Sequence, residues 1–388
     1  MAHRMAGEYG CAQAPLETAV RILEKHSDKC KSELIAAIRE SGWNHKCTGE
    51  YETCETLFEK ALEICETAPE RDEGQIASVL KDLGLICEIR GKCTKAEYYL
   101  KRALEIRKKR FGENDSDVIH SLEFLGTLYK HMGRFRESEQ LLVQSLQKMK
   151  QILGNEHPST LVCLNVLGEL YCDLGRYKEA EPLLRESLDK VRSIFGTRHQ
   201  GTAIGLGKLG ELCSCLGRYE EAEIFLEESL EIIYKLVGKE HLAAAITLER
   251  LGTLHLFRGR YAEAEKNFRA SLFLLNRILG ENHYRSLSCL AKLCETCIHL
   301  GNLSESEAMI HRTLQFAKAE FSDDHPFMSA NMMNWGRICK ARGQYEESIA
   351  YFRKSEEIME KHFDPAHRWL QSCREDLAEL MQMGNANC

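Results

Sequence analysis

The sequence has little proline, no long apolar run and no excess of positive charge. Its 388 residues include six prolines, and no stretch is rich in serine and proline, so nothing indicates a disordered linker. No apolar run approaches the roughly 18 residues of a membrane-spanning helix, and the N-terminus lacks the apolar stretch of a signal peptide. The net charge of −7 argues against a general nucleic-acid binder, whose surface must be basic.

Cysteine, by contrast, is abundant. The 17 cysteines are scattered over predicted helices instead of being spaced as in a small disulfide-rich domain. A free cysteine packs like a small apolar residue. Together with the missing signal peptide, this predicts reduced thiols and a cytoplasmic protein that does not insert into membranes.

Glycine recurs in two columns with a period of 42 residues. The first column contains Gly7, Gly49, Gly91, Gly133, Gly175, Gly217, Gly259, Gly301 and Gly343. The second, seven residues upstream, contains Gly42, Gly84, Gly126, Gly168, Gly210, Gly252, Cys294 and Gly336. Such strict periodicity predicts one long array of stacked repeats instead of two or three separate domains.

One repeat, residues 158–197, shows the pattern. Its first half has apolar residues at spacings of three and four, which predicts one amphipathic helix that ends at Gly175. A second helix follows and ends at Gly196. A bulky residue, usually tyrosine, stands two positions after each first-column glycine. Because this column occurs in every repeat, we interpret it as packing between helix pairs and not as a ligand-stacking surface.

The motif Leu-Gly-x-Leu-Tyr-x-x-x-Gly-Arg-Tyr-x-Glu-Ala-Glu at 167–181 resembles the tetratricopeptide repeat. The resemblance implies an all-α fold, a right-handed α-solenoid of stacked antiparallel helix pairs. The 42-residue period is similar to that of kinesin light chains and of ciliary nephrocystin-type proteins. We expect a half-repeat at 1–28, which begins with the turn Gly7-Glu8-Tyr9, then eight repeats at 29–364. A capping helix with a short tail follows at 365–388 and closes at Gly384-Asn385. The two ends are either caps of the solenoid or the edges of a longer polypeptide.

Two groups of residues resemble metal-binding or redox sites. One histidine per repeat (His157, His199, His241, His283, His325 and His367) cannot converge on a metal, because stacked repeats keep equivalent atoms apart. We expect these histidines to form local hydrogen bonds. Cys294 and Cys297 form a C-x-x-C with Cys289 and His299 nearby, but Cys294 stands in a glycine column, which favours core packing. No phosphate-binding loop or catalytic motif occurs, so the sequence predicts no enzyme, cofactor or metal site.

By resemblance, the first helices line a concave groove that binds a peptide. The predicted groove residues are Arg39, Trp43, Lys81, Glu123, Asn165, Glu169, Lys208, Glu211, Glu249, Arg250, Lys292, Glu295, Asn334 and Arg337. Kinesin light chains carry asparagines here that grip a ligand's backbone, and only Asn165 and Asn334 match them. The carboxylates of repeats three to seven, partly offset by lysine and arginine, favour a ligand with basic residues.

The sequence therefore predicts a non-catalytic scaffold that binds a peptide segment of a partner protein. By resemblance alone, the partner would belong to a motor complex, the cytoskeleton or a cilium. The alternative is the ligand-binding part of a larger signalling protein. The partner is expected to be neither a nucleic acid nor a membrane.

Overall fold

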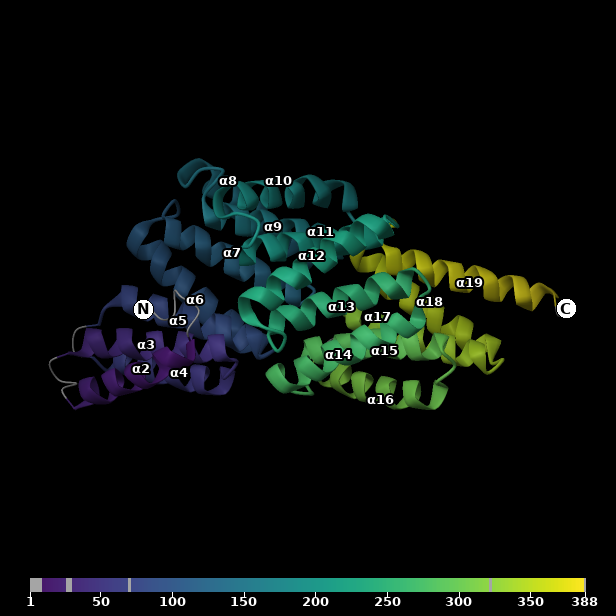
Figure 1. Ribbon diagram of the computed structural model, residues 1–388, viewed down its shortest axis with the longest axis horizontal. Coiled ribbons are helices and arrows are strands. Elements are labelled where there is room, and N and C mark those ends of the chain that lie inside the picture. The colour runs from purple at the N-terminus through teal and green to yellow at the C-terminus, as the bar shows by residue number, and fades with distance from the viewer. Residues whose placement is uncertain (1–8, 26–29, 69–70, 321–322, 387–388) are drawn as a thin grey trace. The chain divides into compact units, whose positions relative to one another are not determined.

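The structure is a computed structural model that describes residues 9–25, 30–68, 71–320 and 323–386. These residues form eighteen helices, α2 to α19, and no strand (Figure 1). The chain divides after Thr160 into two compact units, which are described separately as unit 1 and unit 2. The all-α solenoid of antiparallel helix pairs is confirmed. None of the helices in the described ranges is both long and apolar enough to cross a bilayer.

Unit 1 begins with a single helix and continues with helix pairs. Its helices are α2 (Tyr9–Glu24), α3 (Lys31–Thr48), α4 (Tyr51–Thr67), α5 (Glu73–Ile89), α6 (Cys93–Phe111), α7 (Ser116–His131) and α8 (Phe135–Ile152). The predicted first turn, Gly7-Glu8, lies outside the described residues.

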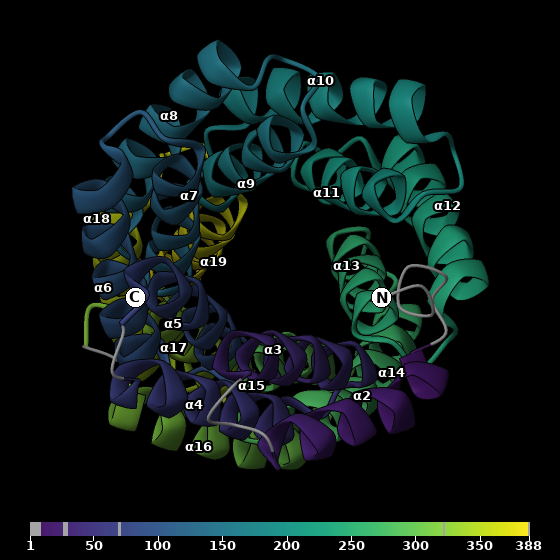
Figure 2. The ribbon, with the colours of Figure 1, turned by 90° about the vertical axis from the view of Figure 1, so that its left-hand side faces the viewer.

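Unit 2 consists of five helix pairs and a final helix. The first helices of the pairs are α9 (Pro158–Asp173), α11 (Gln200–Cys215), α13 (Leu242–Phe257), α15 (Tyr284–His299) and α17 (Pro326–Ala341). The second helices are α10 (Tyr177–Phe195), α12 (Tyr219–Val237), α14 (Tyr261–Leu279), α16 (Leu303–Glu320) and α18 (Tyr345–His362), and α19 spans Arg368–Ala386. Within this unit, α9, α11 and α13 lie on the inner side of α10, α12 and α14 (Figure 2).

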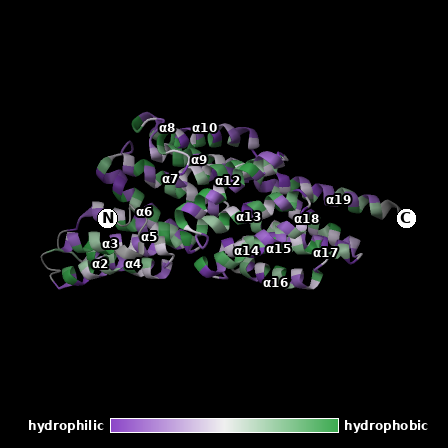
Figure 3. Ribbon diagram, in the orientation of Figure 1, coloured by the Kyte–Doolittle hydropathy of each residue, from purple (hydrophilic) through white to green (hydrophobic). Residues whose placement is uncertain are grey.

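The upstream glycine column forms the seam between the two helices of each pair. A Cβ atom placed on Gly210 would lie 2.6 Å from Leu226, and one on Gly252 would lie 2.8 Å from Phe268. Such distances are too short for real atoms, so the absence of a side chain allows the large residue of the second helix to pack. Apolar and polar residues therefore alternate along the helices (Figure 3), with the apolar ones turned into this seam and the core.

The turn glycines adopt the left-handed conformation that favours glycine. Gly175 has φ +81° and Gly217 has φ +75°. Other glycines with positive φ, among them Gly196 and Gly238, end the second helices. From Gly91 to Gly301 a glycine with positive φ therefore occurs every 21 residues. This is half the 42-residue period, so a glycine follows the first helix of each pair as well as the second.

The histidine column caps the first helices. The backbone N–H of Gly201 donates to Nδ1 of His199 at 3.1 Å, and that of Ala243 donates to Nδ1 of His241 at the same distance. A neutral imidazole accepts one of the backbone donors that the first turn leaves unpaired. The local hydrogen bonds predicted for this column are confirmed at these positions, and their role as helix caps is the new element.

Candidate functional site

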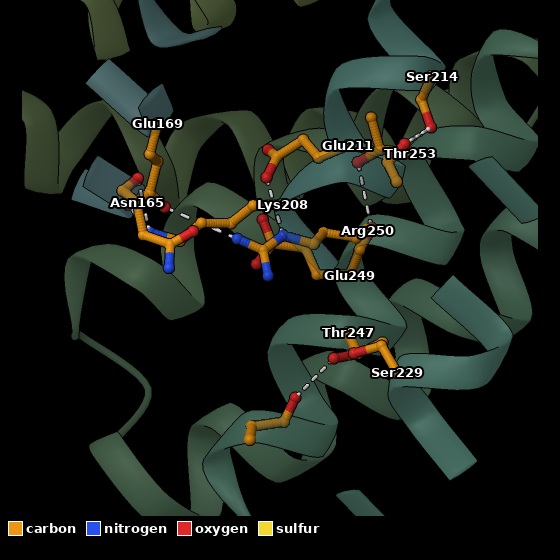
Figure 4. A network of polar contacts seen from close by, with 12 residues as sticks. Asn165, Glu169, Lys208, Glu211, Ser214, Ser229, Thr247, Glu249, Arg250 and Thr253 are labelled. Carbon is orange, nitrogen blue, oxygen red and sulfur yellow. Dashed lines mark hydrogen bonds and ion pairs between the residues drawn. The ribbon is translucent and has the colours of Figure 1, made fainter. Parts of the chain in front are cut away.

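Charged side chains form a continuous ladder of ion pairs across the first helices of unit 2 (Figure 4). Lys208 on α11 lies 3.0 Å from Glu169 on α9, and it also donates to the carbonyl of Asn165 at 3.1 Å. Arg250 on α13 binds Glu211 at 2.8 Å and lies 3.6 Å from Glu169. The two shorter ion pairs join neighbouring repeats and the Arg250–Glu169 contact reaches two repeats away, so these side chains are positioned relative to one another across three helices.

The ladder continues toward the last helix of unit 2. Lys292 on α15 lies 2.7 Å from Glu249 on α13. Arg337 on α17 bridges Glu295 at 2.7 Å and Asp376 on α19 at 3.1 Å. The four unit 2 carboxylates among those predicted to attract a basic ligand are therefore already paired with cations of the protein, namely Glu169, Glu211, Glu249 and Glu295.

Burial and charge act against each other on these groups. Burial alone would raise the pKa of Glu249, but Lys292 and Arg285 outweigh it and the pKa is lowered. Burial lowers the pKa of Lys292, and the carboxylates of Glu249 and Glu211 outweigh it in turn. For Glu295, burial wins over Arg337 and the pKa is raised. Both shifts favour the charged form of the Glu249–Lys292 pair, in which the two charges offset each other.

The two asparagines use their amide donors inside the protein. Nδ2 of Asn165 donates to the Ser187 hydroxyl at 2.7 Å, and Nδ2 of Asn334 donates to the Ala291 carbonyl at 2.9 Å. Both residues are buried. Each bond uses one of the two N–H donors of its amide and stabilises a helix contact, and burial limits a ligand's access to the rest of the group.

The predicted groove residues of unit 1 gather around one carboxylate. Arg39 on α3 donates to Asp82 at 2.7 Å, and Lys81 lies 2.9 Å from its other oxygen. The ammonium group of Lys81 also lies 5.6 Å from the centre of the Trp43 ring. Glu123 on α7 does not join this cluster and is buried.

Several predicted groove positions are more buried than expected. The buried residues of the set are Glu123, Asn165, Lys208, Glu249, Glu295, Asn334 and Arg337. Groove residues would be expected to be exposed, and these seven are not. Ion pairs and amide contacts hold their side chains against neighbouring helices. Their role in binding stays a prediction.

Arg285, on the first turn of α15, is a groove cation that the sequence prediction missed. Its half-buried guanidinium has no ion-pair or hydrogen-bond partner among the residues that the structure describes, although Glu249, Glu169 and Glu211 act on its charge. Burial lowers the pKa of Arg285, but Tyr284 and these carboxylates outweigh it and the pKa is raised. The equivalent positions in the repeats on either side are Ala243 and Phe327, so a positive charge at this position in one repeat alone was the available signal.

The cysteine cluster on α15 is packed in the core. Cys289, Cys294 and Cys297 are buried, and burial raises the pKa of Cys297 to about 11. The His299 ring stacks on Tyr261 with 4.4 Å between the ring centres. Within the described ranges, no group of three or more histidine, cysteine or acidic residues could hold a metal ion.

The family model of the tetratricopeptide repeat matches most of the chain. The matched segments are residues 41–109, 117–193, 165–235, 216–277 and 286–361. A search of curated proteins by sequence returns no significant match.

Solved structures with a similar fold include a Rap protein and NprR. A Rap protein complexed with competence and sporulation factor has a TM-score of 0.60 and 14% identity, over 90% of this chain and 99% of that one. NprR in complex with its cognate peptide NprX has a TM-score of 0.58 and 16% identity, over 90% and 98%. A putative kinesin light chain of nearly identical repeats from Podosopora anserina has a TM-score of 0.42 and 21% identity, over 54% of this chain and 98% of that one.

Proposed function

The chain belongs to the tetratricopeptide repeat family, and on that premise we propose that unit 2 binds a peptide segment of a partner protein in the groove formed by its first helices. Folds of this family are generally non-catalytic interaction scaffolds. Side chains of the first helices would bind the ligand, and the glycine seams between paired helices would stabilise the fold.

The unpartnered guanidinium of Arg285 carries the proposal. The neighbouring cations Lys208, Arg250 and Lys292 are each bound to a carboxylate. No residue that the structure describes accepts from the guanidinium of Arg285, and none of its nitrogens is among the buried atoms left without a partner, so its N–H donors reach solvent and are open to a ligand. Carbonyl or carboxylate oxygens of a peptide would satisfy these donors.

The solved relatives support a peptide as the ligand class. NprR was solved with its cognate peptide, and a Rap conjugation gene regulator with the Phr* peptide; the latter has a TM-score of 0.59 and 15% identity. At this identity the likeness concerns the fold, so the choice of ligand rests on the groove residues of this chain.

The test compares two arginine variants against a random linear peptide library displayed on phage. Arg285→Gln removes the unpaired cation, whereas Arg277→Gln removes an exposed arginine of α14 that faces Glu240 at 3.2 Å. We expect the selected peptides to bind the wild type and Arg277→Gln alike and to lose roughly tenfold or more in affinity with Arg285→Gln. Equal affinity for all three proteins would reject the role of Arg285.

A ligand with basic residues, as expected from the sequence, is the narrower version of this proposal. The ion pairs weaken its basis, because Glu211 and Glu249 already hold Arg250 and Lys292. Glu211→Gln with Glu249→Gln should abolish selection of basic peptides if they bind there. Unchanged enrichment of such peptides would show that these carboxylates do not select the ligand.

A second candidate is the ligand-binding part of a larger signalling protein. It is favoured by a fold neighbour that is a conjugation gene regulator solved with a peptide. Association with a motor complex, the cytoskeleton or a cilium, and a cytoplasmic location, also remain proposals. Imaging the tagged protein beside a microtubule marker tests the location and that association together.

A further inference from the structure

Three branched aliphatic side chains occupy the same position in consecutive repeats of unit 2. Val162 on α9, Ile204 on α11 and Ile246 on α13 are each 42 residues apart, and together they are called the aliphatic row. Val162 is 50% exposed, Ile204 is 41% exposed and Ile246 is half-buried. Much of the apolar surface of Val162 and Ile204 is therefore not used by the core.

The aliphatic row lies on the face of the first helices that carries the ion-pair ladder (Figure 4). Ile204 precedes Lys208 by four residues and Glu211 by seven, and Ile246 precedes Arg250 by four. Residues that are three, four or seven apart share one face of an α-helix. The row therefore runs beside the ladder, about one helical turn nearer the N-terminal ends of the first helices.

The fold of the repeats does not require an aliphatic residue at this position. The equivalent residue is Ser288 in the repeat after Ile246 and Ala330 in the one after that. A position that every repeat needed for packing would stay apolar and large along the array, as the seam residues Leu226 and Phe268 do. Neighbouring exposed apolar side chains that the fold does not need are typical of a surface that binds a partner.

The charges beside the row favour an acidic partner. Arg285 on α15 stands one helical turn before Ser288, so a cation follows where the row ends. The ladder carboxylates next to the row are fewer than the cations that face them. Glu169, Glu211 and Glu249 face Lys208, Arg250, Lys292 and Arg285, which leaves one positive charge in excess.

The spacing of the row suits an extended peptide. The helices α11 and α13 contact each other directly, and packed helices have axes about 8–10 Å apart. A polyproline II backbone advances about 9 Å over three residues and returns to the same side after each three. Every third side chain of such a peptide would therefore meet the next member of the row.

We propose that the aliphatic row and Arg285 select an extended peptide with aliphatic side chains at every third position and an acidic residue beyond one end of this series. The row buries the aliphatic side chains, and the guanidinium of Arg285 binds the acidic one. The inference rests on the proposed function, for which it names the class of peptide.

The experiment compares Ile204→Ser with Ile224→Ser in the full chain. Both remove an exposed isoleucine from the same repeat, but Ile224 lies on the second helix α12 and is 63% exposed. Random peptides displayed on phage are selected on the wild type and sequenced, and fluorescence anisotropy gives their affinity for each variant. Val162→Ser is a second variant of the row and is measured in the same way. A separate selection on Arg285→Gln reports on the acidic residue.

We expect the wild type to enrich peptides with aliphatic residues three positions apart and an acidic residue. Ile204→Ser and Val162→Ser should lower their affinity by on the order of tenfold, because each loses part of the buried apolar surface. Ile224→Ser should bind them like the wild type. Selection on Arg285→Gln should keep the aliphatic spacing and lose the acidic residue.

Two results would overturn the inference and leave peptide binding in place. The first is a set of enriched peptides without aliphatic spacing or with basic residues in place of the acidic one. The second is equal affinity of the enriched peptides for Ile204→Ser, Val162→Ser and Ile224→Ser. A wild type that enriches no peptide at all would reject the proposed function, and the inference with it.

Discussion

The two units fill the same capping position with different residues. In unit 1, Asp72 and Asp115 accept a backbone N–H at the start of α5 and α7 at 2.9 and 2.8 Å. In unit 2, histidines such as His283 and His325 accept the equivalent N–H of α15 and α17 at 3.1 and 3.2 Å. The repeat therefore preserves an acceptor at this position and not a residue type, and the two units should respond differently to acid.

The grooves differ in a related way. In unit 1, Arg39 and Lys81 share the single carboxylate of Asp82. In unit 2, Glu249 accepts its hydrogen bond from Lys292 alone. A shared carboxylate tolerates the loss of one cation better than a separate pair does, because the second cation remains.

Acid should reveal the largest difference between the units. Burial lowers the pKa of His325 and of His367 to about 4 and also lowers that of His241. Above about pH 6.5 these rings are neutral in both the folded and the unfolded chain, so their burial does not make the free energy of unfolding depend on pH. Between pH 6.5 and 4 the unfolded chain binds protons first, and unit 2 loses about 1.4 kcal/mol per unit of pKa separation at each such histidine.

Tryptophan fluorescence measures the two units separately. Trp43 reports on unit 1 in a chain with Trp335→Phe and Trp369→Phe, and Trp43→Phe leaves the reporters of unit 2. Unit 2 should unfold at lower urea concentration at pH 5 than at pH 7, with a smaller change in unit 1. His325→Asp should reduce the shift in unit 2. Equal shifts in both units would contradict this prediction.

The helix seams should show no difference between the units. A Cβ atom would lie 2.5 Å from Leu100 at Gly84 and 2.6 Å from Leu226 at Gly210, so alanine at either position should cost roughly 1–3 kcal/mol in urea unfolding. Gly207→Ala on α11 is the control, because its Cβ meets only the flexible end of Arg250 at 2.9 Å. The free energy of unfolding of Gly207→Ala should stay close to that of the wild type. A cost confined to one unit would show that the seams are not equivalent.

Removing one cation of the first helices should change the free energy of unfolding least, but by different amounts in the two units. Lys292→Met leaves Glu249 buried without its hydrogen-bonded partner and should cost roughly 1–2 kcal/mol. Lys81→Met leaves Asp82 bound to Arg39 and should cost less than about 1 kcal/mol. Urea unfolding of both variants checks this difference. If Lys81→Met proved the more costly, the shared-carboxylate argument would fail.

Much of the fold was predictable because its determinants repeat. The 42-residue glycine columns predicted the helix pairs, and the packing roles of Cys294 and of the histidine column followed from their places in the period. The groove was less predictable, because its properties depend on contacts between repeats. Burial of Asn165 and pairing of Glu211 arise from side chains one repeat away, and nothing in the periodicity indicates that His367 packs against Gly175.

The glycine spacing of 21 residues also has a mechanical consequence. Each helix of a unit is a stiff rod, and consecutive rods are joined at a left-handed glycine that, at Gly217, Gly238 and Gly259, has open space around it. Since each repeat contacts mainly its neighbours, tension along such a unit would be divided among many small, similar rotations. The unit would then stretch elastically before any helix unravels, and Gly175, against which His367 packs, would be its stiffest joint.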